Sequence, residues 1–282
     1  MNYVLPFLLE EGVYRGRFVK CETLMDELLQ HHAYPPMVEE VLTQAVIVAV
    51  LLASSLKYEG LFTLQVQGDG PVTLIVVDVS DDGRVRASVR YDEEKLPKQA
   101  ATLSDLTGKG VLVFTVDQAL SENERYQGVV ELNGSDLATG VLSYFDKSEH
   151  MPTDLVLLTQ VKDGHRQAAG LMVQQLPGKA VEPGKDDFET ISVLMQSVRK
   201  KEVFDDSLSP EQVLFRLFHA NLLLLFPKKD IRFECRCSYD KVKKMLAQFS
   251  NEQLNDMYED GIIHVTCQFC GKTYDFKKED LS

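Results

Sequence analysis

The stretch that decides the organisation of this chain lies near its C-terminus: Phe233-Glu234-Cys235-Arg236-Cys237, followed after 29 residues by Cys267-Gln268-Phe269-Cys270-Gly271. Structural zinc sites take four ligands in a tetrahedron, and cysteine thiolate is among the ligands that zinc prefers. The CxxC pair followed by Gly271 lets two sulfurs converge on one ion, because glycine can adopt positive φ. In the CxC pair the two side chains share one face of an extended strand, and the chain must curl at Arg236 for both to reach the ion. The pattern predicts one Zn²⁺ bound by Cys235, Cys237, Cys267 and Cys270.

The residues between the two cysteine pairs fit a small α/β zinc module. Ser238 can cap a helix over 239–249, and Ser250 with Gln253 can form a capping box before a helix over 251–259. Gly261 ends that helix, and segments 262–266 and 273–276 then form a hairpin whose tip carries the CxxC pair. So short a unit buries little core, so we expect the metal to supply a large part of its stability.

Upstream of this module, residues 179–230 are interpreted as a helical connector. The boundary is marked by LPGKAVEPGKDD (176–187), which contains two Pro-Gly pairs. Apolar residues fall on one face of a helix predicted over 187–201. Ser209, Pro210 and Gln212 are typical of the start of another helix, which is expected to run to 226 and end at Pro227. The connector has more apolar surface than a free linker can leave in water, so we expect it to pack on the rest of the chain.

Residues 1–178 are expected to form a larger N-terminal domain. Segment 38–56 is apolar almost all round, which predicts a buried helix. Runs rich in Val, Leu and Thr predict strands at 61–67, 72–79, 85–91, 110–117, 126–132 and 151–161, with a helix over 135–145. Gly68-Asp69-Gly70-Pro71 is read as a turn between two of these strands. The expected fold class is therefore α/β (α+β): a mixed sheet-and-helix domain (1–178), a helical connector (179–230) and a small Cys₄ zinc domain (231–282).

Composition argues against several classes of function. The formal net charge of −13 argues against broad nucleic-acid binding, which depends on Lys and Arg. The longest purely apolar run, 45–53, has nine residues, whereas a membrane span needs roughly 20. The N-terminus lacks the basic and apolar segments of an export signal. We therefore expect a cytoplasmic protein that binds neither nucleic acid nor membrane, and in such a chain clustered cysteines more often bind metal or respond to redox change than form a disulfide framework.

The same cysteines suit a redox switch. Four cysteines allow three disulfide pairings, and the local pairing would close only small rings that constrain the unfolded chain little. Losing a structural zinc removes about 10–16 kcal/mol of apparent binding energy, whereas a typical domain is stable by about 5–15 kcal/mol. Oxidation of this kind should unfold the module, and the connector could lose its packing with it.

Along most of its length the chain resembles the redox-regulated heat-shock chaperone family, the thirty-three-kilodalton heat-shock proteins. The resemblance rests on 67–71 (QGDGP), 144–153 (YFDKSEHMPT), 168–170 (AAG), 175–177 (QLP) and CxC followed by CxxC about 30 residues later; His150 and Ala169 depart from the family pattern. It implies an ATP-independent holdase of the cytoplasm that is inactive when reduced and zinc-bound. Oxidation would form the Cys235–Cys237 and Cys267–Cys270 disulfides, release zinc and unfold the C-terminal region. The hydrophobic surface then exposed would bind unfolding client proteins and prevent their aggregation, and the oxidised form would be a homodimer.

Other functions and other residues fit the pattern less well. A zinc-ribbon protein that binds nucleic acid or a partner predicts a basic face, yet 231–282 holds eight Lys and Arg against nine Asp and Glu. A zinc hydrolase needs an open coordination position, which four thiolates do not leave. No Ser or Cys nucleophile has a recognisable catalytic partner, so we expect no enzyme. His264 is interpreted as a hairpin side chain rather than a spare ligand, and Cys21 as a small buried residue.

Overall fold

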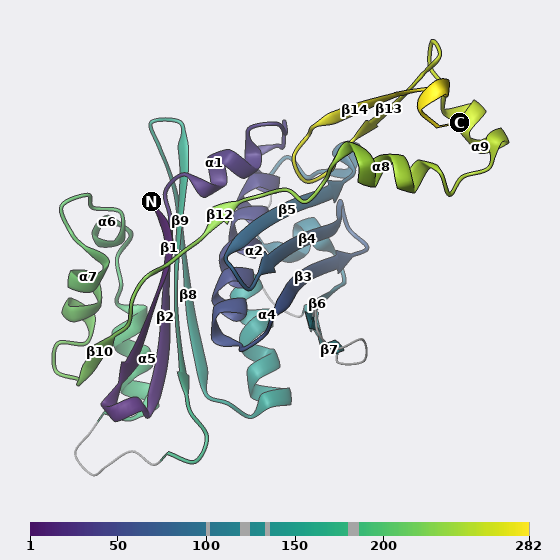
Figure 1. Ribbon diagram of the computed structural model, residues 1–282. Helices are drawn as coiled ribbons and strands as arrows, with labels where there is room; N and C mark the ends of the chain where they lie inside the picture. The colour runs from purple at the N-terminus through teal and green to yellow at the C-terminus, as the bar shows by residue number, and fades with distance from the viewer. Residues whose placement is uncertain (100–101, 119–124, 133–135, 180–185, 282) are drawn as a thin grey trace.

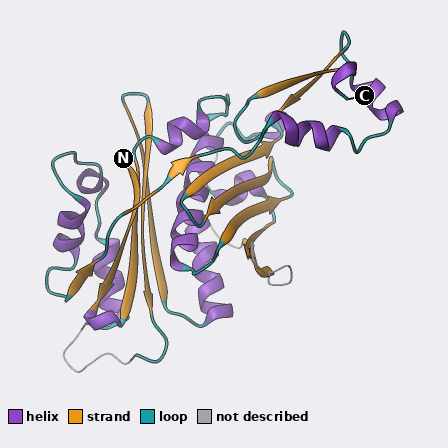
Figure 2. Cartoon of the chain, viewed as in Figure 1, coloured by secondary structure: helices purple, strands orange, loops and turns teal. Residues whose placement is uncertain are grey.

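The computed structural model of the chain describes residues 1–99, 102–118, 125–132, 136–179 and 186–281. Two six-stranded sheets lie on either side of a central helix, and a small module projects beyond the second sheet (Figure 1). The two sheets with that helix are called the two-sheet body below. Runs of two or three consecutive strands are separated by helices in the body, as the cartoon in Figure 2 shows, and the α+β class expected from the sequence is confirmed.

The first sheet is antiparallel and is built from both ends of the N-terminal region and from the connector. Its order is β10-β1-β2-β9-β8, and β11 also pairs with β1. The strands are β1 (Asn2–Leu9), β2 (Tyr14–Cys21), β8 (Thr153–Lys162), β9 (His165–Gln175), β10 (Leu223–Leu225) and β11 (Lys229–Asp230). The sequence predicted β8 but not β1, β2 or β9.

The second sheet comes from the middle of the chain, closed at one edge by a late strand. Its order is β12-β5-β4-β3-β6-β7. The strands are β3 (Gly60–Gly68), β4 (Val72–Ser80), β5 (Arg84–Tyr91), β6 (Gly110–Gln118), β7 (Arg125–Leu132) and β12 (Arg232–Phe233). The predictions for β3 to β7 are confirmed, and the Gly68–Pro71 segment is the turn between β3 and β4.

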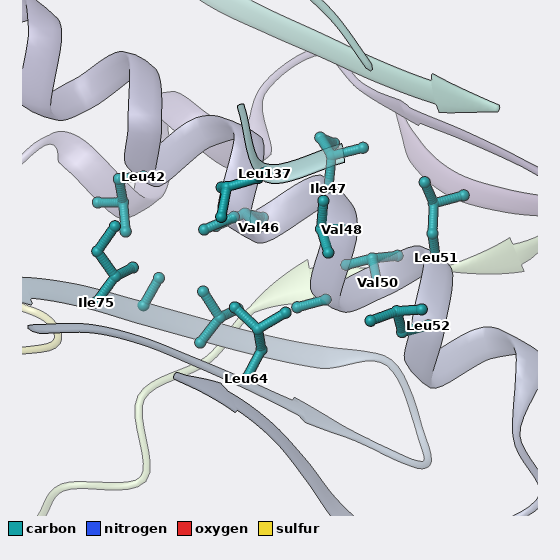
Figure 3. Packing of buried hydrophobic residues seen from close by; sticks show 14 of the residues in the cluster. Leu42, Val46, Ile47, Val48, Val50, Leu51, Leu52, Leu64, Ile75 and Leu137 are labelled. Atoms are coloured by element: carbon teal, nitrogen blue, oxygen red, sulfur yellow. The ribbon is translucent and has the colours of Figure 1, made fainter. Parts of the chain in front are cut away.

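Helix α2 (Pro36–Ser55) fills the space between the sheets. Leu42 lies beside Ile75 of β4 (Figure 3), whereas Ile47 and Leu51 point the other way and pack against Gly170 of β9 in the first sheet. By length and composition the helix could cross a membrane, but its apolar window is 72% buried inside the protein. It is therefore the core helix that the sequence predicted. Helices α1 (Leu24–Leu29), α3 (Leu103–Thr107) and α4 (Leu137–Tyr144) contribute to the same core.

One predicted helix, α4, differs slightly from its expected bounds. The helix expected over 135–145 is α4, which continues as a π-helical turn from Phe145 to Glu149. Residue 135 lies outside the described residues. Asp136 is the N-cap, because its carboxylate accepts a hydrogen bond from the backbone N–H of Thr139 at 2.8 Å.

The described part of the connector forms an outer layer on the first sheet. Helices α5 (Phe188–Gln196), α6 (Lys200–Val203) and α7 (Pro210–Leu217) lie on the side of that sheet away from α2 (Figure 1). They share a second apolar core with the sheet, in which Ile191, Leu214 and Phe218 meet Phe7 and Phe18. The connector is therefore packed, as its composition indicated.

Two helix predictions within the connector were wrong. The helix expected over 187–201 is broken, because Arg199 is extended and separates α5 from α6. The helix expected to continue to 226 ends at Leu217. Residues Leu223–Leu225 instead pair with Phe7–Leu9 of β1, since that strand has a free edge and the leucine run has no helical periodicity.

Candidate metal centre

The four predicted ligands come together at one point. Their Sγ atoms all lie within 4.8 Å of one another. The sulfur of Cys235 is 3.4 Å from that of Cys237 and 3.7 Å from that of Cys267, and the sulfurs of Cys237 and Cys270 are 3.5 Å apart. A disulfide would require about 2.05 Å, so these are free thiols. Tetrahedral zinc with Zn–S bonds of about 2.3 Å would separate the sulfurs by about 3.8 Å, so the donor set and its spacing fit such an ion.

The CxC pair is positioned by the second sheet. Strand β12 runs parallel to β5, with Phe233 opposite Val85, and the N–H of Glu234 donates to the carbonyl of Val85 at 3.1 Å. The chain therefore leaves the sheet edge directly at Cys235. No other group of three or more His, Cys, Asp or Glu side chains in the described ranges is close enough to hold a metal ion.

The CxxC pair sits in a tight turn at the tip of a hairpin. Strands β13 (Ile262–Thr266) and β14 (Thr273–Lys277) pair antiparallel, as the sequence predicted. The N–H of Gly271 donates to the carbonyl of Cys267 at 2.8 Å, and the N–H of Cys267 to that of Lys272 at 2.9 Å. Gly271 has φ +65°, the positive φ expected of it.

The rest of the module is small. Helices α8 (Tyr239–Leu246) and α9 (Asn251–Met257) begin at the predicted caps Ser238 and Ser250, and each ends earlier than predicted. Its buried apolar side chains are Leu246, Leu254, Ile263, Tyr274 and Phe276. Five residues make a limited core, which agrees with a module that depends on its cysteines for stability.

Burial and hydrogen bonds within the cluster both shift the pKa values of its thiols. Burial raises the pKa of Cys235 and of Cys270. Burial also acts to raise the pKa of Cys237, but the Tyr274 hydroxyl, which donates to its sulfur at 3.1 Å, and the neighbouring thiols lower it to about 7. The thiolate form, which binds metal and reacts with oxidants, is therefore more accessible at Cys237 than at Cys235 or Cys270.

Two residues weighed as alternatives lie away from the cluster. The Nδ1 atom of His264 is 2.7 Å from the Asp275 carboxylate across the hairpin, which makes it a hairpin side chain. Cys21 is fully buried in the core of the two-sheet body, and burial raises the pKa of its thiol.

Sequence reasoning missed the body residues that meet the cysteine loops. Burial lowers the pKa of His32, and the backbone of Phe269 acts in the opposite direction with a smaller effect. Arg86 of β5 lies over the Phe269 ring, and Asp78 of β4 binds Arg236. No sequence spacing points to these contacts, because the partners lie far apart in the chain.

Fold and site together define a protein with a two-sheet body and a C-terminal four-cysteine module. The family model described as Hsp33 protein matches residues 2–277. The "33 kDa chaperonin" of Pectobacterium carotovorum subsp. carotovorum is 35% identical over 276 residues, covering 98% of this chain and 93% of that protein. The protein of the same name from Escherichia coli is 33% identical over 277 residues, covering 98% and 92%.

A solved structure has the same fold. The crystal structure of the 33 kDa chaperonin (heat shock protein 33 homolog) from Thermotoga maritima superposes with a TM-score of 0.83 at 24% identity, covering 99% of this chain and 96% of that one. The chain belongs to the Hsp33 family of heat-shock chaperones. The family resemblance inferred from the sequence is thereby confirmed.

Proposed function

We propose that the protein is a redox-regulated, ATP-independent holdase of the cytoplasm, inactive when reduced and activated by oxidation of its C-terminal cysteines. Membership of the Hsp33 chaperone family supports the holding of unfolded client proteins. The observation that carries the redox part is the meeting of two cysteine pairs, from either end of a 29-residue spacer, in a module with a five-residue buried core.

In the reduced protein Cys235, Cys237, Cys267 and Cys270 would hold one Zn²⁺. Bound zinc would keep all four sulfurs as thiolates and link the two chain segments, supplying stability that the small core does not. The four-sulfur donor set fits zinc and leaves no open coordination position for a substrate. The site is therefore structural, and no catalytic role is assigned to it.

Oxidation would convert the zinc-binding thiolates into disulfides, which no longer bind the ion. Overall, two thiols and one molecule of hydrogen peroxide give one disulfide and two molecules of water, with sulfur oxidised and the peroxide oxygens reduced. We propose the pairs Cys235–Cys237 and Cys267–Cys270. The sulfurs of the crossed pairs, Cys235–Cys267 and Cys237–Cys270, are also close, at 3.7 Å and 3.5 Å. However, crossed disulfides would link the same two segments again, whereas local ones leave them unconnected, so only the local pairing lets the module come apart.

Residues 223–233 connect the C-terminal module to the connector, so unfolding of the module can affect the connector. Residues 223–233 run as one strap along both sheets, through β10 and β11 on β1 and then β12 on β5. The short pairings of this strap leave it few hydrogen bonds once the module at its end unfolds. Helices α5 and α7, which precede the strap, bury Ile191 and Leu214 against the first sheet, and Phe218 directly after α7 is buried there too. These apolar faces of connector and sheet would become the surface that holds clients and joins two oxidised copies.

The proposal is tested by treating reduced protein with mild peroxide while zinc release, disulfide pairing and aggregation of a heat-unfolded client are followed. Metal should leave, peptide mapping should give the two local disulfides, and aggregation should be suppressed only after oxidation. Size-exclusion chromatography should show a dimer in the oxidised sample. Equal suppression by reduced and oxidised protein would overturn the switch.

A further inference from the structure

The cysteine loops touch the two-sheet body at a few specific side chains. Asp78 of β4 is 5% exposed, and its carboxylate accepts hydrogen bonds from Thr63 at 2.7 Å, from Arg86 at 2.8 Å and from Arg236 at 2.8 Å. Arg236 lies between the two cysteines of the CxC pair. A nearly buried carboxylate of the body is therefore neutralised in part by the metal-binding loop itself.

The loop that carries the CxxC pair contacts Arg86, the arginine that is bonded to Asp78. The guanidinium carbon of Arg86 is 4.0 Å from the centre of the Phe269 ring, well within the range of a cation–π contact. Phe269 lies between the two cysteines of the CxxC pair. Both cysteine pairs are thus joined to one Asp78–Arg86 ion pair, whose closest N–O distance is 2.6 Å.

The turn after α1 provides a third contact. A Cβ on Gly271 would lie 2.5 Å from the Cβ of His31, so the CxxC turn and residue 31 are closely packed. The ring of His32, next to residue 31, stacks on Tyr34 with centroids 4.7 Å apart. Figure 1 shows this end of the β13–β14 hairpin next to α1 and the end of β5.

We propose that Asp78 and Arg86 form a docking latch that holds both cysteine loops on the body and sets how readily the cysteines are oxidised. The proposal rests on the redox function proposed above and adds the residues that tune it. To bond in pairs, the sulfurs must leave their present arrangement, which requires Arg236 and Phe269 to move. While the latch is closed, their contacts with Asp78 and Arg86 oppose that movement.

The test compares full-length Arg86→Ala with Arg90→Ala, a matched change at an exposed arginine on the same strand. A hydrogen bond to a charged group is worth about a tenfold change in an equilibrium. Arg86→Ala should therefore bind one zinc when reduced and release it about tenfold faster than wild type under peroxide, as read by a chromogenic chelator. Its amide hydrogen exchange at 235–237 and 267–271 should be faster even without oxidant, whereas Arg90→Ala should match wild type.

Phe269→Ala and the double variant Arg86→Ala/Phe269→Ala complete a double-mutant cycle. If Arg86 acts through the Phe269 ring, its substitution should have a smaller effect in the Phe269→Ala background. An undiminished effect there, or Arg86→Ala matching Arg90→Ala in both exchange and zinc release, would overturn the latch. Wild-type protein that keeps its zinc under peroxide would overturn the redox function instead. In that case, amide hydrogen exchange of reduced Arg86→Ala and Arg90→Ala would still show whether Arg86 holds the cysteine loops on the body.

Discussion

Phe218→Ala should release the connector without touching the cysteines. Phe218 directly follows α7, is fully buried, and its ring lies 5.9 Å from that of Phe7 on β1. Truncating a buried phenylalanine to alanine costs about 3–5 kcal/mol. Phe218 belongs to the core between the connector and the first sheet rather than to the core around α2. The cost should therefore fall on opening of the connector, and it should raise the population of the open state by about a hundredfold to several thousandfold.

The expected result is a reduced, zinc-loaded protein that suppresses client aggregation without oxidant. Light scattering of a heat-unfolded client gives the activity, a chelator assay gives the zinc content, and hydrogen exchange over 186–226 reports opening. Phe215→Ala is the matched control, because Phe215 lies on α7 but is 62% exposed, and such a surface change usually alters stability by about 0.5 kcal/mol or less. If exchange shows an open connector in Phe218→Ala while holding stays at the Phe215→Ala level, the connector and the sheet beneath it are not the client surface.

Three further substitutions probe the module itself. Cys267→Ser should leave the protein deficient in zinc and its C-terminal module loosened, as measured by metal analysis and hydrogen exchange; full zinc retention would mean that the ligand set is wrong. Tyr274→Phe removes the hydroxyl that donates to the Cys237 sulfur and should weaken zinc binding about 10- to 100-fold in chelator competition, so an unchanged affinity would exclude a supporting role for that bond. Gly271→Ala places a side chain at φ +65° and against His31, which should cost at least about 1–2 kcal/mol and speed exchange at 267–271; exchange equal to wild type would contradict the close packing described for that turn.

Elements whose signals are local could be predicted from the sequence. The capping boxes at Ser209 and Ser250 form as expected, because the serine side chain and the glutamine three residues later satisfy each other's backbone N–H groups. The buried helix α2 follows from a long apolar run, and the β13–β14 hairpin from Gly261 and the CxxC turn. These features depend on neighbours within a few residues.

Elements that depend on distant partners could not be predicted in this way. Strand β1 is buried at positions on both faces and includes Pro6, so it lacks the alternating pattern of a half-buried strand. Strand β10 is an apolar run whose conformation is decided by the free edge of β1, more than 200 residues earlier in the chain. Local propensity gives no sign of either.

At the candidate metal centre, too, the local motif could be predicted and the contacts between distant residues could not. The four cysteines could be identified because thiolates at these spacings have few other uses in such a chain. Asp78 and Arg236 lie 158 residues apart, and Arg86 meets Phe269 only because β12 places the module beside β5. The sequence therefore identifies the candidate ligands, and the fold is needed to find what holds them in place.

The most direct test of the account is the zinc content of the full-length protein measured together with hydrogen exchange over 231–281, before and after peroxide. We predict one zinc per chain and a protected module in reduced protein, then loss of both in parallel as the cysteines are oxidised. Reduced protein that carries no zinc yet keeps a protected module, or oxidised protein whose module stays protected after the metal has left, would contradict it.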